Sequence, residues 1–302
     1  MMKTGGFLNM LIAVLFVPLC AFSQQRFPKV IPAGNYSGIC ALGNDRYAVV
    51  SDKSVEDGFF VFRLVVDTLR GRIVEAANEG FRSSGLPNCD MEGICFYPPD
   101  GTVFVANEQH NEVNEYTLDG QRTGRKLALP DEVGRAHPNY GLESLCYDDN
   151  SHRFFTATER PLPGDSLLHI YAFDEWLRLS ETYYYRPDPP ISRKYYYGVS
   201  EICALGDGRL LVLERQLRVP RLKIGAKAVV RLYEVRPSDG PRLEKQLLCE
   251  LRSTLGLTSR KFANYEGLCL LPGWLLLVAD SQNQYKGVLR DWFKLVPLEG
   301  NH

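Results

Sequence analysis

The sequence predicts an all-β protein built as a single β-propeller of five four-stranded blades, and three observations support this. A short phrase ending in cysteine recurs five times, 51 to 66 residues apart, at Cys40, Cys95, Cys146, Cys203 and Cys269. A second phrase, an apolar run ending in an acidic residue, follows each cysteine by 11 to 13 residues. Turn sequences such as Pro-Pro-Asp-Gly at 98–101 separate short apolar segments. Four strands per repeat of this length are typical of a propeller, and a sixth blade would need about 40 further residues.

Each repeat is expected to form an antiparallel meander. In the second repeat we expect strands over 93–97, 102–107, 113–118 and 125–129, and in the first over 39–42, 47–50, 59–66 and 72–76. The fourth repeat has the same pattern around its turn at 206–208. The fifth ends with its third strand, over 293–298, so residues 27–32 are expected to supply the missing fourth strand and close the ring. A closed ring uses up the sheet edges, and we therefore expect a monomer.

Composition excludes some classes of function. The 302 residues are 45% hydrophobic and 24% charged, as in ordinary globular proteins, and the net charge is −1. This balance gives no basic surface for nucleic acid.

The first residues have the pattern of an export signal. Lys3 precedes an apolar stretch over 7–19, and Ala21-Phe22-Ser23 offers a small-x-small cleavage site. The stretch is short for a membrane span. We therefore expect a signal peptide over 1–23 and a single propeller domain over 24–302, located in the periplasm or secreted. Lipoprotein anchoring through Cys20 is less favoured, because Leu19 stands where a small residue is expected.

The repeated cysteines are expected to be small buried residues. Equivalent positions on neighbouring blades are too far apart for a disulfide, which needs Cα atoms within about 7 Å. Cys89 and Cys249 lie outside the repeat, and whether they pair stays open.

Acidic residues recur at two repeat positions that meet on one face of the ring. Glu92, Glu143 and Glu266 open first strands, while second strands end at Asp52, Glu108, Glu159, Glu214 and Asp280. Because these strands run antiparallel, up to eight carboxylates are expected around one mouth. Such crowding needs compensation, and Ca²⁺ with oxygen ligands is the simplest one. Serines hold the first-strand position in the other two repeats, and Glu201 is shifted by one residue, which turns its side chain to the opposite face.

Arginine is the alternative compensation. Arg160 and Arg215 directly follow acids of the second phrase. Four more arginines precede the first phrase and are expected in loops that roof the mouth, and they are Arg82, Arg135, Arg193 and Arg260. Guanidinium groups there suit a carboxylate or phosphate ligand. Equally, the carboxylates could pair with arginine and backbone N–H groups without any ligand.

Two tyrosine triplets, 183–185 and 195–197, flank a proline-rich turn. They could stack on a sugar or another ring, or pack against the neighbouring blade.

Several of these phrases together resemble a known family. Asp90-Met91-Glu92-Gly93-Ile94, Asn264-Tyr265-Glu266-Gly267-Leu268 and Thr158-Glu159-Arg160 are similar to segments of the bacterial "esterase-like activity of phytase" family, with a resemblance that runs from about 32 to 298. It implies a propeller that acts on phosphate or other esters. Similarity in kind to calcium-dependent propeller phytases implies metal or base roles for Asp52, Glu92, Glu108, Glu143, Glu159 and Glu266, and phosphate-binding roles for the six arginines.

Three hypotheses follow. In the first, the small anionic or ester ligand is a phosphate or carboxylate ester, and a divalent metal assists its hydrolysis, with Glu143, Glu92 and Glu266 as the catalytic glutamates. In the second, the mouth binds an anionic or glycan ligand without turnover. In the third, calcium only stabilises the scaffold.

Overall fold

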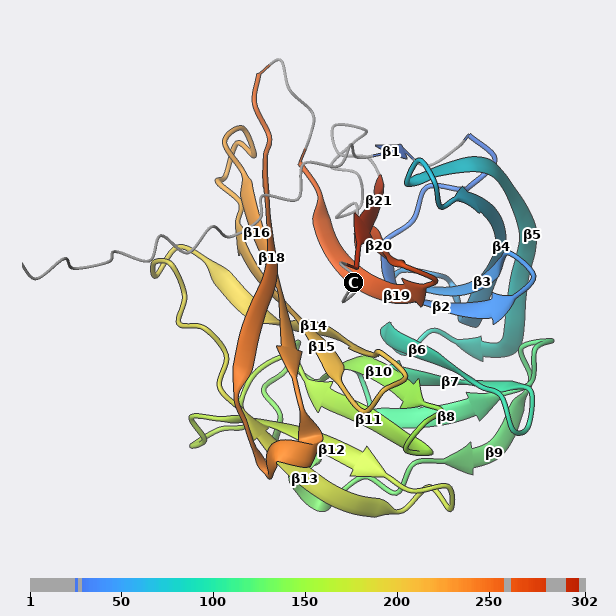
Figure 1. Cartoon of the computed structure of the whole chain (residues 1–302), viewed down its shortest axis with the longest axis vertical. Helices are drawn as coiled ribbons and strands as arrows, with labels where there is room; N and C mark the ends of the chain where they lie inside the picture. The colour runs from blue at the N-terminus through green and yellow to red at the C-terminus, as the bar shows by residue number, and fades with distance from the viewer. Residues whose placement is uncertain (1–24, 27–28, 258–261, 281–291, 299–302) are drawn as a thin grey trace, which may run out of the picture.

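Five antiparallel sheets surround a common axis in the computed structural model (Figure 1), which describes residues 25–26, 29–257, 262–280 and 292–298. The innermost strands contact one another in a closed ring, in the order β2, β6, β10, β14, β19 and back to β2. The predicted all-β, five-bladed propeller is therefore confirmed.

Blades 1 and 2 are simple meanders. Blade 1 contains β2 (Tyr36–Gly43), β3 (Arg46–Ser51), β4 (Glu56–Asp67) and β5 (Arg72–Pro87), and blade 2 contains β6 (Met91–Tyr97), β7 (Thr102–Asn107), β8 (Glu112–Tyr116) and β9 (Arg122–Lys126). The fourth strand of blade 2 begins and ends three residues before the expected 125–129. Leu127 is buried and Leu129 packs on the same core, so their apolar character reflects packing beyond the strand.

Blades 3 and 4 are linked by an additional strand. Blade 3 contains β10 (Leu142–Asp148), β11 (Arg153–Thr158), β12 (Leu168–Phe173) and β13 (Leu179–Tyr185), preceded by the 3₁₀ turn η1 (Asp131–Arg135). Blade 4 contains β14 (Tyr196–Ala204), β15 (Leu210–Arg218), β16 (Lys227–Val235) and β18 (Lys245–Thr254). Between β16 and β18, after the turn η2 (Pro237–Asp239), β17 (Arg242–Leu243) crosses over and pairs in parallel with β13.

Blade 5 joins the two ends of the ring. It contains β19 (Asn264–Leu271), β20 (Trp274–Asp280), β21 (Trp292–Pro297) and the N-terminal β1 (Gln25–Arg26), whose residues pair with Phe293 and Trp292. An N-terminal strand thus completes the last blade as predicted, but it is β1 and lies before the expected span of 27–32. Residues 27–28 lie outside the described residues, and 29–32 form no strand. Ile31 is buried in the core between blades 5 and 1, so it contributes by packing and not by strand pairing.

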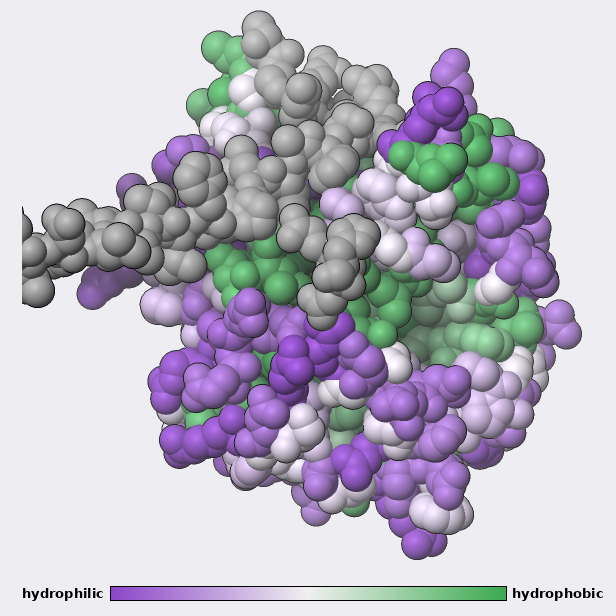
Figure 2. All heavy atoms as spheres, viewed as in Figure 1, coloured by the Kyte–Doolittle hydropathy of each residue, from purple (hydrophilic) through white to green (hydrophobic). Residues whose placement is uncertain are grey.

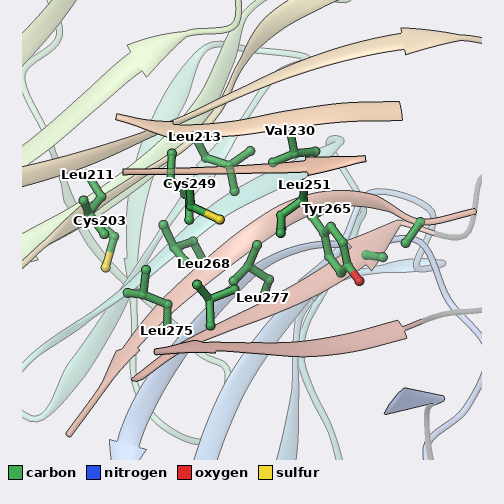
Figure 3. Close-up of a cluster of buried hydrophobic side chains, with 14 residues drawn as sticks. Cys203, Leu211, Leu213, Val230, Cys249, Leu251, Tyr265, Leu268, Leu275 and Leu277 are labelled. Atoms are coloured by element: carbon green, nitrogen blue, oxygen red, sulfur yellow. The ribbon is translucent and has the colours of Figure 1, made fainter. Parts of the chain in front are cut away.

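The hydrophobic core is divided among the interfaces between neighbouring sheets. Figure 3 shows one such cluster, in which Leu213 and Leu251 of blade 4 face Leu268 and Leu277 of blade 5. Hydrophilic side chains cover most of the face in Figure 2 over blades 2 and 3, at the lower part of the view. Sheets that bury both faces in this way hold their inner strands in fixed register, which is what positions a shared site at the axis.

The cysteines behave as small core residues. Four of the five repeated cysteines are buried and Cys40 is half-buried. No two of the seven described cysteines are joined by a disulfide, so Cys89 and Cys249 do not pair. The glycine that follows glutamate in the repeat lies where neighbouring inner strands approach closely. A Cβ on Gly93 would lie 2.7 Å from the backbone nitrogen of Leu145 on the next inner strand.

The expected signal peptide, 1–23, lies outside the described residues. Within the part of the chain that is described, no helix is long and apolar enough to cross a membrane.

Candidate functional site: an acidic pocket at the propeller mouth

A β-bulge at the start of every inner strand builds the first ring of the site. In every blade the register of the first strand shifts against the second at an equivalent place, which contains Ser37, Glu92, Glu143, Ser200 or Glu266. A bulge adds one residue to one strand and re-aims its side chain. The bulge interrupts the regular alternation of side chains between the two faces of the sheet. The three glutamates of the first phrase therefore point toward the mouth.

The second ring is formed by residues of the second strands, beside the bulge of each first strand. Each member directly follows the second-strand residue that pairs with the residue just before the bulge, and the five are Asp52, Glu108, Glu159, Arg215 and Asp280. Arg215 is therefore the blade 4 counterpart of four acids. The prediction that Glu214 joins the mouth is wrong by one residue, and such a shift reverses the side chain of a strand residue.

Glu214 lies on the other side of β15, in a separate network. Its carboxylate accepts hydrogen bonds from the Tyr185 hydroxyl at 2.5 Å, from the Asp188 backbone N–H at 2.9 Å and from Lys245 at 2.6 Å. Comparing the five repeats missed this shift, because β15 continues to Arg218 without a turn signal. The end of its apolar run therefore does not mark the end of the strand.

The two rings enclose a pocket of about 200 Å³, called here the acidic pocket. It is lined by Asp52, Lys53, Asp90, Glu92, Glu108, Asn139, Glu143, Glu159, Arg215, Glu266 and Asp280. Seven of the eight acids predicted as metal ligands are among them. Sequence reasoning missed Asp90, Lys53 and Asn139, although each adjoins a repeat phrase. Eight carboxylates face two cationic side chains, and this imbalance defines the chemistry of the site.

Arg215 neutralises one side of the acidic pocket. Its Nη2 donates to Glu143 Oε1 at 3.0 Å and to Glu159 Oε1 at 3.1 Å, while Nη1 donates to Glu266. Its Nε is buried and has no hydrogen-bond partner among the described residues. One guanidinium of blade 4 thus holds three glutamates from blades 3 and 5 in fixed positions.

The opposite side of the acidic pocket holds a compact group of carboxylates. Ligand oxygens of Asp52, Asp90 and Glu92 lie within 4.8 Å of one another. The Lys53 ammonium lies 2.9 Å from Asp52 and 2.9 Å from Asp90, with its side chain half exposed. Three carboxylates with one mobile cation make a donor set that suits a hard divalent metal ion.

Burial and mutual repulsion raise the pKa values of the acidic pocket. Burial, reinforced by neighbouring carboxylates, holds the pKa of Glu92 and of Glu143 well above the ordinary value. Burial raises the pKa of Glu266 to about 7, although Arg215 opposes the shift. A carboxyl group with a pKa of about 7, such as that of Glu266, exchanges protons near neutral pH, as acid–base catalysts must.

The remaining predicted arginines do not line the acidic pocket. Arg160 lies beside it, Arg82 belongs to the outer strand β5, Arg135 ends η1 at the surface, and Arg193 is exposed in the loop before β14. Arg82 thus lies in a strand and not in the expected roof loop, because β5 continues far past the predicted 72–76. Arg260 lies outside the described residues.

Glu201 turns away from the mouth, as its one-residue offset predicts. Its Oε1 accepts hydrogen bonds from the N–H groups of Leu145, at 3.1 Å, and Ile202, at 3.0 Å. It is 1% exposed.

Comparison with known protein families shows to which family the chain belongs. A family model described as "Phytase-like: Esterase-like activity of phytase" matches residues 31–282. No curated protein matches the chain.

Solved structures with a similar course of the chain share little sequence. An exo-β-1,3-galactanase from Phanerochaete chrysosporium has a TM-score of 0.51 and 11% identity, over 89% of this chain and 61% of that one. An endo-arabinase from Bacteroides thetaiotaomicron has a TM-score of 0.49 and 12% identity, over 90% and 95%. Hydrazine synthase of Kuenenia stuttgartiensis has a TM-score of 0.41 and 8% identity, and the chain spans 56% of it. At 11% identity the likeness to the galactanase shows the fold alone.

Proposed function

The chain belongs to the phytase-like family, "Esterase-like activity of phytase", and we therefore propose that it hydrolyses phosphate or other esters in the acidic pocket with a bound divalent cation. Ca²⁺ is the cation we expect, since every ligand offered is an oxygen. We further propose that the protein works in the periplasm or outside the cell, after removal of residues 1–23.

The observation that carries this proposal is the convergence of Asp52, Asp90 and Glu92, whose ligand oxygens lie within 4.8 Å of one another. These side chains would hold the cation, and the half-exposed Lys53 can swing into solvent to make room. When bound, a divalent cation polarises an ester and lowers the pKa of a water molecule that it binds.

The other side chains of the pocket have distinct tasks in this proposal. Glu143, buried and fixed by its hydrogen bond from Arg215, accepts the proton of the attacking water. Glu266, whose pKa burial raises to about 7, is a further proton-transfer group. Arg215 stabilises the negative charge that develops on the ester oxygens, in a site where water screens it little.

Glu143→Gln tests this assignment. The amide keeps an acceptor for Arg215 but cannot take a proton, so we expect kcat/KM for an aryl phosphate or aryl acetate ester to fall by about 100-fold or more. The assay is run with added Ca²⁺ and with EDTA, and activity should be lost in EDTA. Circular dichroism and a thermal melt verify that the variant folds.

Glu75→Gln is the matched control, because Glu75 lies exposed on the outer strand β5 and pairs with Arg63. It should leave turnover unchanged. Full turnover by a folded Glu143→Gln protein would remove Glu143 from the mechanism, and turnover that persists in EDTA would remove the metal.

A further inference from the structure

A second cavity lies beside the acidic pocket, between the mouths of blades 3 and 4. Its volume is about 420 Å³, and it is called here the tyrosine cavity because it is lined by Asn139, Tyr140, Glu159, Tyr196, Tyr197, Arg215, Leu217 and Val219. Asn139, Glu159 and Arg215 also line the acidic pocket, so the two spaces share a wall. A molecule that occupies one can extend into the other.

The aromatic wall of the tyrosine cavity is fixed by Arg160. Its guanidinium carbon lies 3.7 Å from the centroid of the Tyr140 ring and 4.7 Å from that of Tyr197, and its Nε donates to the Tyr197 carbonyl at 2.9 Å. Cation–π contacts of this kind hold rings in place. Arg160 therefore organises the cavity wall, which differs from the phosphate-binding role expected from the sequence.

The lining of the tyrosine cavity is amphipathic in a specific way. Tyrosine rings with Leu217 and Val219 supply apolar surface, and polar side chains gather on the wall shared with the acidic pocket. Tyr196 is 60% exposed, so its ring faces solvent at the start of β14. A flat apolar face with polar groups along one edge matches a hydroxylated six-membered ring, whose C–H face packs on tyrosine and whose hydroxyls bond to the edge.

We propose that the tyrosine cavity binds a pyranose ring, the alcohol part of an ester whose reacting group enters the acidic pocket. The part about the ester rests on the proposed function, whereas binding of the ring itself does not. Tyr196 provides a stacking face, and Asn139 and Glu159 receive the ring hydroxyls.

Binding of methyl β-D-glucopyranoside tests the ring site without any turnover. We expect saturable binding to the intact mature protein in a ligand-observed NMR titration. Tyr196→Ala should weaken it roughly three- to tenfold, the range that one lost aromatic contact gives. Tyr196→Phe should bind like the parent, because the ring and not the hydroxyl carries the contact.

Tyr184→Ala is the control from the other tyrosine triplet. Tyr184 is 37% exposed on β13, with its ring 5.1 Å from that of His169, and does not line the cavity. It should leave binding unchanged. No saturable binding to the parent protein, or equal affinity in the Tyr196→Ala variant, would overturn the proposal.

Comparing glucose 6-phosphate with methyl phosphate separates this proposal from the proposed function. If both proposals hold, Tyr196→Ala raises KM for the sugar ester and leaves methyl phosphate unaffected. If esters are hydrolysed but the substitution changes neither KM, the ring site is wrong and the function stands. If neither ester is hydrolysed while the glycoside binds through Tyr196, the ring site stands and the function is wrong.

Discussion

Glu201 is a carboxyl group enclosed by the ring of inner strands. Its Oε1 accepts two backbone hydrogen bonds, whereas its Oε2 is buried with no hydrogen-bond partner among the described residues. Burial raises the pKa of Glu201 well above its ordinary value, and the two N–H donors only partly oppose the shift. The thiols of Cys95 and Cys203, close enough for its charge to raise their pKa values, are also buried. The folded protein therefore keeps a proton on Glu201 that the unfolded chain releases.

This difference predicts how stability depends on pH. An unfolded glutamate releases its proton above a pH of about 4.3, whereas folded Glu201 releases it only at higher pH. The contribution of Glu201 to stability is thus complete below that pH and is lost as the pH rises through the raised folded pKa. Glu201→Gln keeps the acceptor oxygen and cannot ionise. We expect its Tm at pH 8 to exceed that of the parent by about 3 °C, the shift that ~1 kcal/mol produces in a domain of this size.

The same melts at pH 4.5 provide the comparison for Glu201→Gln. There the advantage of the variant should shrink, because the parent side chain is protonated in the folded state and only about half ionised in the unfolded state. An equal Tm difference at pH 4.5 and pH 8 would show that the proton on Glu201 plays no part.

At the scale of the elements, close approach between strands fixes the acids as firmly as charge does. Gly198 of β14 pairs with Arg215 of β15, and a Cβ on Gly198 would lie 2.4 Å from Glu159 Cγ. Glycine at this position leaves the space in which Glu159 reaches from blade 3 over blade 4. There Glu159 contacts Arg215 at 3.1 Å.

Gly198→Ala should therefore displace Glu159 and loosen its contact with Arg215. We expect a loss of about 1–3 kcal/mol in the free energy of unfolding, as for other overpacked positions, together with reduced ester turnover. Urea denaturation measures the first effect. Gly134→Ala is the control, since a Cβ there meets nothing within 4 Å. Unchanged stability and activity in the Gly198→Ala variant would contradict this view of the packing.

The strands also show how far sequence reasoning reaches. The cysteine period and the turn signals predicted five blades correctly, because burial against both neighbouring sheets imposes the same apolar pattern on every repeat. Positions at strand ends were less predictable. Arg215 and not Glu214 faces the mouth because of the register of one long strand, β15. Arg82 was misplaced because β5 continues to Pro87. Asp90 lies two residues before Glu92, but the other four repeats have no acid at this position, so the repeat pattern did not mark it.

At the scale of the whole molecule, a nearly neutral protein concentrates negative charge at its axis. The net charge is −1, yet eight carboxylates face two cationic side chains in one pocket of about 200 Å³. The rings arise because each blade contributes the same two backbone positions, and the closed ring brings all of them to one mouth. Placing like charges this close costs stability, which a bound divalent cation would recover by mass action.

Metal content and thermal stability test this account most directly. The purified mature protein is analysed for metals by mass spectrometry, and its Tm is measured before and after EDTA. We expect stoichiometric Ca²⁺ and a Tm that falls on chelation and recovers when Ca²⁺ is added back. Asp90→Asn should reduce the metal-dependent shift, since it removes one charge from the ligand group. Absence of bound metal, with the same Tm in EDTA and in Ca²⁺, would contradict the account and leave Arg215, Lys53 and retained protons as the compensation for the acidic pocket.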